Sequence, residues 1–459
     1  MKKILFFTVF SILFISIFTG CSSQKSAVDV LDDELPEFTE SGDEPVIPKW
    51  WHAFDDESLN NLVNQALQDN FDLRIAWQRL QASEAQSRAA SASFFPVLDA
   101  SAGGQTSKGG NTFGSGDNYS TDLAASYEVD LWGRIAAQAK AADFYSKAAR
   151  KNYQTAAITL AAEITRTWYQ LQETELQIDI VEEQIKTNRD VLELLKTRFG
   201  SGQVRSVDIM RQEQLLERTR EQQISLQEQR AILKNRLSIL SGQPPQESRE
   251  YAVSDLPDLP PKPKTGLPAE LIQRRPDVQN AFLELKAADE ELAVAISSRY
   301  PRISLNASIG TASDDIGNIF DNFVRSFGGN LLAPVFYGGE LRAEQDRAEA
   351  RKKEKAYQYG QTVLLAFEEI ENALIQENQQ LKSLNSIQNQ VELAEKTYEQ
   401  LRTEYFNGMS NYLDVLTALD ELQQLRRNYL QGRYELIDYR IALYRALAGP
   451  FETERENVN

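Results

Sequence analysis

The chain has 459 residues, of which 42% are hydrophobic and 25% are charged. This balance excludes a disordered chain, and a mean hydropathy of -0.45 is too low for a bundle of membrane-spanning helices. The formal net charge of -18 argues against nucleic-acid binding, because a nucleic-acid partner requires a basic face.

The N-terminus has the pattern of an export signal. Lys2 and Lys3 precede a short apolar run that ends at Phe18, which predicts a signal peptide over residues 1–20. Cys21, the only cysteine, follows directly and has no partner for an internal disulfide. The arrangement resembles a bacterial lipobox, with Phe18 where leucine is preferred, so we expect a covalent lipid on Cys21 and a tether over 21–48. The alternative is a plain signal peptide with an incidental cysteine.

The first half of the mature chain predicts short helices, a strand pair and a long helical hairpin. Residues 50–68 carry apolar side chains at helical spacing, and 72–92 continue as an alanine-rich helix. Strands follow Pro96, and the second of them alternates apolar and polar residues over 122–131. A helical register then runs unbroken from Arg134 to Phe199, about 100 Å at 1.5 Å per residue. A partner helix over 207–240 completes the hairpin.

The second half repeats the first. Asp72 and Asp277 are 205 residues apart, and Gly202 and Gly408 are 206 apart. A period this long indicates a domain-sized duplication. The predicted organisation is a first repeat over 49–246, a proline-rich connector over 247–268, a second repeat over 269–449 and a C-terminal tail over 450–459. The repeated elements are a helix over 274–297, strands over 302–309 and 327–336, a long helix that breaks at Phe406-Asn407-Gly408, and a partner helix over 413–447.

The strands each predict one apolar face. Ile303, Leu305, Ala307 and Ile309 alternate with polar residues, as a tilted transmembrane strand of about ten residues would. For any single strand, an ordinary soluble sandwich is the better explanation of the pattern. Four strands cannot close a membrane barrel, because the smallest barrels have about eight. If the strands span a membrane, several chains must share one barrel, and three chains would supply twelve strands.

The long helices show sustained spacings of three and four between apolar residues. This spacing favours coiled-coil packing over a compact globular core. The same heptad positions recur 206 residues apart in the two copies, as Ile178, Val181, Ile185, Asn188, Leu192, Leu195 and Phe199, and as Leu384, Ile387, Val391, Ala394, Tyr398, Leu401 and Tyr405.

These features together resemble the outer membrane efflux protein family, the TolC-like channels, and most closely the lipoprotein branch that serves resistance-nodulation-division (RND) pumps. The resemblance covers about residues 48–449. It is carried by Trp50-Trp51 with Leu59, and by 127–134, 197–208, 266–277, 334–341 and 405–416.

The resemblance implies an α+β membrane protein. Long helices would form a coiled-coil barrel, and the four strands of each chain would contribute to a twelve-stranded barrel shared by a homotrimer in the outer membrane of a Gram-negative-type cell. Its implied function is passive export of small molecules, such as drugs and toxic compounds. The implied partners are outer-membrane lipid, a periplasmic adaptor and an inner-membrane RND-type transporter. One alternative is that the protein is an outer-membrane duct for type I protein secretion. Another is that it is a periplasmic coiled-coil adaptor or scaffold.

The family's tunnel closes at the hairpin tips. By motif, Leu413, Asp414, Thr417 and Asp420 are candidates for the pore-lining gate, and Asp208 is the first-repeat equivalent of Asp414. Three Asp414 carboxylates near a narrow axis would repel one another, and cations or adaptor side chains could relieve the repulsion. The alternative is a solvated helix face, since an acid near a helix N-terminus is expected in any case.

The sequence lacks the residues of a catalytic site. His52 is the only histidine and has no metal-ligand partner in its pattern, and no phosphate loop, GxSxG or HExxH motif occurs. We therefore predict that the protein is not an enzyme and holds no metal or cofactor apart from the lipid on Cys21. The energy for export must come from a partner.

Overall fold

A computed structural model describes residues 36–107, 116–245, 251, 254–266 and 273–456. The predicted signal peptide, Cys21 and most of the tether lie outside the described residues. Among the residues described, no helix combines the length and apolar character needed to cross a bilayer.

The N-terminal helices differ in one detail from the prediction. Residues 50–68 do not form one helix but a 3-10 helix, η2 (Trp50–Phe54), followed by α2 (Glu57–Asp69). The break lies at Asp55, whose φ of 53° is left-handed, and the Asp56 side chain then caps α2 by accepting from Leu59 N. Helix α3 (Phe71–Ala92) follows, capped in the same way by Asn70.

Four antiparallel strands form one sheet in the order β1-β2-β3-β4. They are β1 (Val97–Ser107), β2 (Gly116–Val129), β3 (Arg302–Ser313) and β4 (Val324–Leu332). Strand β2 begins earlier than the alternation predicted, and β4 ends before Pro334 rather than at Phe336, because proline cannot donate to the ladder. The central pair, β2 and β3, joins the two repeats.

The register gathers the apolar residues on one side of the sheet. Leu123 lies opposite Ile309, Tyr127 opposite Leu305, and Ala307 opposite Phe327. Residues between them, such as Ser126 opposite Asn306, occupy the other side. The predicted alternation therefore separates an apolar from a polar face across β2 and β3, whereas the apolar side of β4 also carries Arg325, opposite Ile309.

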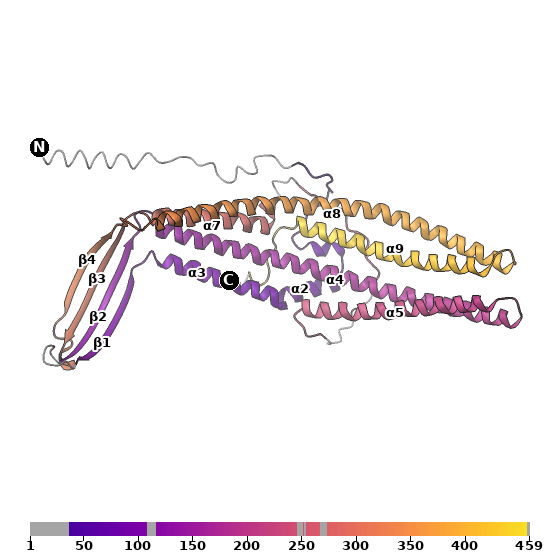
Figure 1. Ribbon diagram of the computed structural model, residues 1–459, viewed down its shortest axis with the longest axis horizontal. Coiled ribbons are helices and arrows are strands. Elements are labelled where there is room, and N and C mark those ends of the chain that lie inside the picture. Colours follow the sequence, from indigo (N-terminus) through magenta and orange to yellow (C-terminus); the bar gives the residue numbers. More distant parts are fainter. Residues whose placement is uncertain (1–35, 108–115, 246–250, 252–253, 267–272, 457–459) are drawn as a thin grey trace. The chain divides into compact units, whose positions relative to one another are not determined.

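The long helices follow the strands in both repeats. Helix α4 (Arg134–Gly200) and helix α8 (Glu340–Phe406) each have 67 residues, and α5 (Ser206–Leu240) and α9 (Tyr412–Leu447) return beside them. Beside the sheet, α3, α4, α7 (Pro276–Ser297) and α8 lie next to one another, and toward the turns α5 and α9 take the places of α3 and α7 (Figure 1). The heptad residues of α4 from Ile178 to Leu195 are buried, as the spacing predicted, whereas Phe199 is exposed.

The main core lies halfway along α4. Trp50 and Trp51 are fully buried there, and Trp50 stacks on Tyr444 of α9 with ring centroids 5.6 Å apart. Trp168 of α4 donates its indole N–H to Asp56 over 2.7 Å. Short N-terminal helices and the C-terminal end of α9 thereby fasten both repeats at one level.

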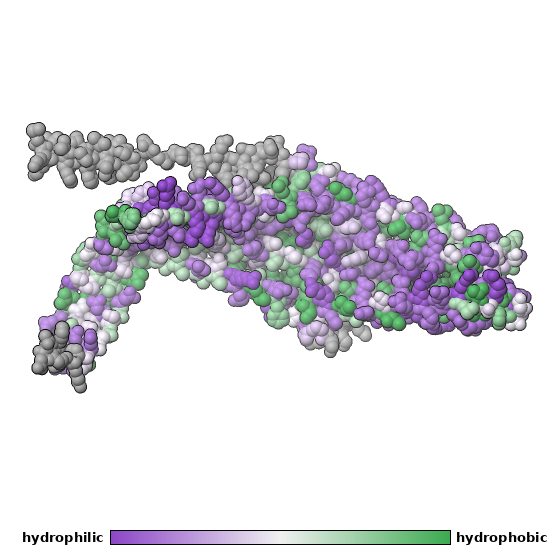
Figure 2. Space-filling view, viewed as in Figure 1, coloured by the Kyte–Doolittle hydropathy of each residue, from purple (hydrophilic) through white to green (hydrophobic). Residues whose placement is uncertain are grey.

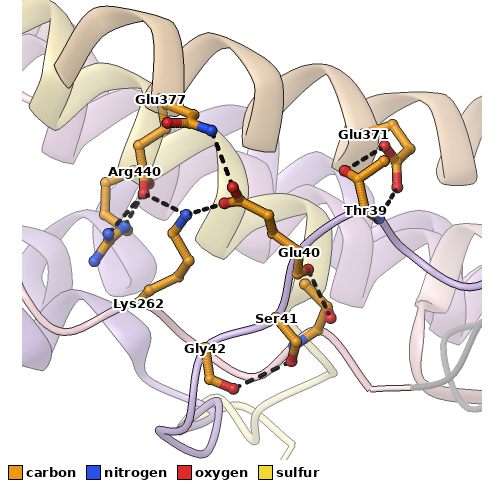
Figure 3. Close-up of polar contacts among 10 residues, drawn as sticks. Thr39, Glu40, Ser41, Gly42, Lys262, Glu371, Glu377 and Arg440 are labelled. Atoms are coloured by element: carbon orange, nitrogen blue, oxygen red, sulfur yellow. Dashed lines mark hydrogen bonds and ion pairs between the residues drawn. The ribbon is translucent and has the colours of Figure 1, made fainter. Parts of the chain in front are cut away.

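A segment just before η2 crosses the second repeat at this level. Thr39 binds both carboxylate oxygens of Glu371, and Glu40 pairs with Lys262 of the connector over 2.6 Å (Figure 3). Lys262 also reaches Glu377, which is fully buried and held by Arg440. The connector is therefore fixed to α8 and α9 by an ion network.

Candidate functional site

Both long helices end in the same backbone turn. Gly202 and Gly408 adopt φ of +75° and +73°, a left-handed conformation that favours glycine. Each turn closes with two backbone hydrogen bonds back to the helix, from Gly202 N to Phe199 O and Gln203 N to Arg198 O, and from Gly408 N to Tyr405 O and Met409 N to Glu404 O. These turns lie at the opposite ends of α4 and α8 from the strands.

The second tip presents one exposed stripe made of a leucine and three polar residues. Leu413, Asp414, Thr417 and Asp420 all lie on the side of α9 that faces away from its buried residues, because their spacing follows the helical repeat. Leu413 is 41% exposed. Asn411 caps the helix by accepting from Asp414 N over 3.2 Å. The Asp414 carboxylate accepts from Ser410 Oγ, and among the described residues no cation lies within ion-pair distance of it.

The first tip places the equivalent acid differently. Asp208 is 4% exposed, so its carboxylate is buried at the start of α5. Arg205 donates to both of its oxygens over 3.2 Å, and Arg211 lies 3.8 Å away. Asp208 therefore stabilises its own turn and is not available on an open surface.

Three contacts join the two tips within one chain. Arg218 of α5 pairs with Asp420 of α9 over 2.7 Å, and the Tyr412 hydroxyl donates to Gln212. Burial raises the pKa of Tyr412, so this hydroxyl remains a donor at neutral pH. The Arg198 guanidinium lies over the rings of Tyr405 and Phe406, at 5.3 and 4.8 Å from their centroids.

Polar side chains also fill the interface between α4 and α9. Asn188 is fully buried and bonds Thr219 and Gln423, while Gln184 donates to Gln423 O over 3.1 Å. Gln177 donates to Arg427 O over 3.0 Å. Inside each hairpin the packing is apolar, with Val181, Ile185, Leu192 and Leu216 in the first and Tyr398, Val415, Ala418, Leu419 and Leu422 in the second. Leu215 of α5 packs into the second cluster, so the hairpins are joined to one another by hydrogen bonds and by an apolar contact.

The structure brings four of the five predicted gate residues together on α9 and sets Asp208 apart. Sequence reasoning missed the cations. Arg205 and Arg211 stand three residues before and after Asp208, a spacing that indicates a helix ion pair and could have been used. No local signal connects Arg218 with Asp420, since they are 202 residues apart and meet only through the packing of α5 on α9. Within the described residues, no group of three or more His, Cys, Asp or Glu side chains is arranged to hold a metal ion.

The comparisons agree with this architecture. A sequence profile of the outer membrane efflux protein family matches the chain twice, over residues 62–243 and 267–449. The pyoverdine export outer membrane protein OpmQ of Pseudomonas aeruginosa is 30% identical over 424 residues, covering 90% of this chain and 89% of the relative. The cation efflux system protein CusC of Escherichia coli is 27% identical, with 88% of each chain covered.

Solved structures show the same fold. The outer-membrane channel OprN superimposes with a TM-score of 0.84 at 27% identity, over 91% of this chain and 98% of that one. The outer membrane protein VceC of Vibrio cholerae gives a TM-score of 0.82 at 26% identity, over 88% and 100%. The repeated profile, the shared sheet and the paired helical hairpins all lead to one conclusion: this chain belongs to the outer membrane efflux protein family.

Proposed function

We propose that three copies of this chain form a channel through the outer membrane that passively conducts small molecules out of the cell. A periplasmic adaptor and an inner-membrane RND-type transporter would deliver the cargo. The observation that carries the proposal is a four-stranded sheet with one mainly apolar face and two open edges, joined to helices that cannot enclose a pore alone.

The sheet is suited to lipid and to completion by other copies. Leu98, Phe327 and Leu331 on its apolar face are two-thirds or more exposed, which water would penalise and a bilayer would favour. Strands β1 and β4 are edge strands, and open edges are prohibitive in lipid. Twelve strands from three copies satisfy both requirements.

Aromatic side chains mark both ends of the sheet. At the helix junction, Trp132, Phe336 and Tyr337 are exposed, and Figure 2 shows hydrophobic residues gathered there. At the other end, Phe320 and Phe323 stack between β3 and β4. Aromatic girdles of this kind lie at the two interfaces of membrane barrels, so the strands between them are the proposed membrane segment.

The outer helices carry apolar residues that the single chain leaves uncovered. Helices α3 and α5 form one side of the helical layer and α8 forms the other. Exposed apolar residues occur on both sides, namely Phe71 and Ile75 on α3, Met210, Ile224 and Ile232 on α5, and Tyr357, Leu364, Ile375 and Leu393 on α8. If α8 of one copy packs against α3 and α5 of the next, these apolar residues are buried and the helical tunnel is closed.

Within this channel, the second tip is the proposed gate. Leu413, Asp414 and Thr417 would line the constriction, and Asp420 would hold it closed through Arg218. Asp208 is not included, because it is buried against its own arginines. The hydrogen bonds between the hairpins favour movement, since they can be exchanged for water, and the packing of Leu215 against α9 is the apolar contact that opening would break.

We further propose that Cys21 carries a covalent lipid and that the cargo consists of small molecules. The printed names of relatives include exporters of pyoverdine, solvents, toluene and cations, all small cargoes, which favours small-molecule efflux over protein secretion. Metabolic labelling with a palmitate analogue tests the anchor. Wild-type protein should be labelled and Cys21→Ala should not, whereas equal labelling would refute lipidation.

A pair of arginine substitutions tests the channel architecture. Leu123→Arg places a charge on the apolar face at a cost of about 2–4 kcal/mol per copy in the bilayer, and should prevent assembly into a membrane trimer. Ser126→Arg lies three residues away on the polar face and should be tolerated. Native mass spectrometry of the detergent-extracted protein measures the oligomer. A wild-type protein that is a stable soluble monomer would overturn the proposal.

The gate is tested by comparing equivalent acids. Asp414→Ala should raise the conductance of the channel in planar bilayers several-fold and admit large antibiotics into intact cells, because it removes charge and bulk from the constriction. Asp208→Ala is the matched control and should leave the open-channel conductance unchanged. If the two variants behave alike, Asp414 is only a solvated acid at a helix start.

A further inference from the structure

A cavity lies where the four helices meet the sheet. It has a volume of about 730 Å³ and is lined by α3, α4, α7 and α8 together with Arg302 at the start of β3. Small side chains, including Ala142, Ala295 and Ala348, leave this space open. The volume falls in the range of small-molecule sites, about 300–1,000 Å³.

The cavity is continuous with the polar face of the sheet. Arg302 alternates with Ser304 and Asn306 on β3, so it belongs to the polar side. Arg134, another lining residue, donates to Glu128, which pairs with Ser304 on that same side. In a barrel whose apolar face contacts lipid, the polar side is the interior, and the cavity therefore opens to the lumen.

Positive charge predominates in the lining. Four arginines and two glutamates contribute, and two of the arginines are already engaged: Arg134 pairs with Glu128, and Arg347 with Glu344. Arg302 and Arg351 have no carboxylate within ion-pair distance among the residues that the structure describes. The remaining acid, Glu291, accepts a hydrogen bond from Tyr145.

With four arginines and two glutamates, the cavity lining is positively charged, although the chain as a whole has a formal net charge of -18. A positively charged wall attracts anions. Burial and, to a smaller extent, the Glu291 carboxylate raise the pKa of Tyr145 to about 12. Its hydroxyl therefore stays neutral and adds no negative charge to the cavity wall.

We propose that this cavity is a cargo-binding site for organic anions, compounds that combine an apolar ring system with a carboxylate, sulfonate or phosphate group. Arg302 and Arg351 bind the anionic group, and the alanine-rich walls of α4, α7 and α8 contact the rings. The inference rests on the proposed channel function and adds a preference for one class of cargo at the last stage before the membrane segment.

Fluorescence anisotropy on the purified full-length protein tests the site with two dyes of similar shape. Fluorescein is anionic at pH 7.5, and rhodamine 123 is cationic. The wild-type protein should bind fluorescein more tightly than rhodamine 123. Arg302→Gln/Arg351→Gln should weaken fluorescein binding about tenfold or more, because it removes both charge-assisted contacts. Rhodamine 123 binding should be unchanged or slightly stronger.

Arg88→Gln is the control, because it removes one positive charge from α3 at an exposed residue that does not line the cavity. Equal affinity for the two dyes, or equal losses in the control and the double variant, would overturn the anion site. Conductance of the same preparations in planar bilayers is measured in parallel. Pores without dye preference would contradict only the binding site, whereas the absence of pores would contradict the channel itself.

Discussion

The two hairpins have the same backbone conformation but differ in where their acidic side chains are paired with cations. Both long helices have 67 residues and end at a left-handed glycine. At the first tip, Asp208 is buried between two arginines. At the second, Asp414 is exposed and is held only by Ser410 and the Asn411 cap.

Halfway along the helices the pattern is reversed. Glu173 of α4 is buried with hydrogen bonds from Gln177 and Thr174, and no cation among the described residues pairs with it. Glu377 of α8 is also buried, but Arg440 binds both of its oxygens and Lys262 lies 3.5 Å away. The second hairpin therefore has a paired acid at its middle and the unpaired acid Asp414 at its tip, where Arg218 of the first hairpin reaches Asp420.

This difference separates what duplication preserves from what it does not. Backbone turns depend on one or two residues and survive in both copies. Ion pairs depend on partners from other elements, and these partners have diverged. A hairpin that is fixed in the middle by a buried ion network and has an unpaired acid at its end is suited to move at that end, which supports the proposed gate on α9.

The largest effect is expected from the buried pair at the middle of the second hairpin. Glu377→Gln leaves Arg440, which is 2% exposed, without a countercharge, and should destabilise the protein by about 3–5 kcal/mol. Thermal unfolding of the detergent-extracted protein measures the change. Glu371→Gln is the control on the same helix, where the lost hydrogen bonds to Thr39 are solvent-exposed and contribute about 1 kcal/mol.

A double variant sharpens this result. Glu377→Leu/Arg440→Met removes both charges and should recover much of the stability, because a buried charge without a partner is more costly than no charge. If the double variant is less stable than Glu377→Gln, the contacts of Arg440 with the connector matter more than the pair.

A smaller effect is expected at the first tip. Asp208→Asn removes a buried carboxylate from the start of α5 and its contacts with Arg205 and Arg211, and should destabilise the hairpin by about 2 kcal/mol. Asp414→Asn should change stability by less than about 0.5 kcal/mol, because its side chain is exposed and the Asn411 cap remains. Limited proteolysis at the two turns measures local opening. Equal losses would contradict the division between a tip with a paired acid and a tip with an unpaired one.

The turn glycines should respond alike. Gly202→Ala and Gly408→Ala each force alanine into a left-handed conformation, which costs about 1 kcal/mol. An added Cβ would meet no atom within 4 Å at either position, so the cost is conformational in both. Unequal effects on thermal stability would show that the backbones of the two turns are not equally strained.

The sequence predicts features that depend on local periodicity. The heptads of α4, the turn glycines and the alternating face of β3 are all visible in spacing, and the structure confirms them. The break at Asp55 was missed because a left-handed aspartate has no periodic signal. Similarly, nothing near Asp420 in the chain points to Arg218, since their contact depends on how two hairpins pack. The sequence therefore locates the candidate gate, but it does not show the cations that distinguish Asp208 from Asp414.

The smallest effect concerns the buried acid that lacks a cation. Burial raises the pKa of Glu173 above its ordinary value of 4.5. Below that ordinary value the carboxyl is protonated in both the folded and unfolded protein, so no penalty arises. As pH rises through the raised pKa, the folded protein must bury a charge and loses stability. Glu173→Gln should therefore be slightly more stable than the wild-type protein at pH 8 and equal to it at pH 4, measured by thermal unfolding across that range. Glu377→Gln should show no such gain at pH 8, because the charge it removes is paired.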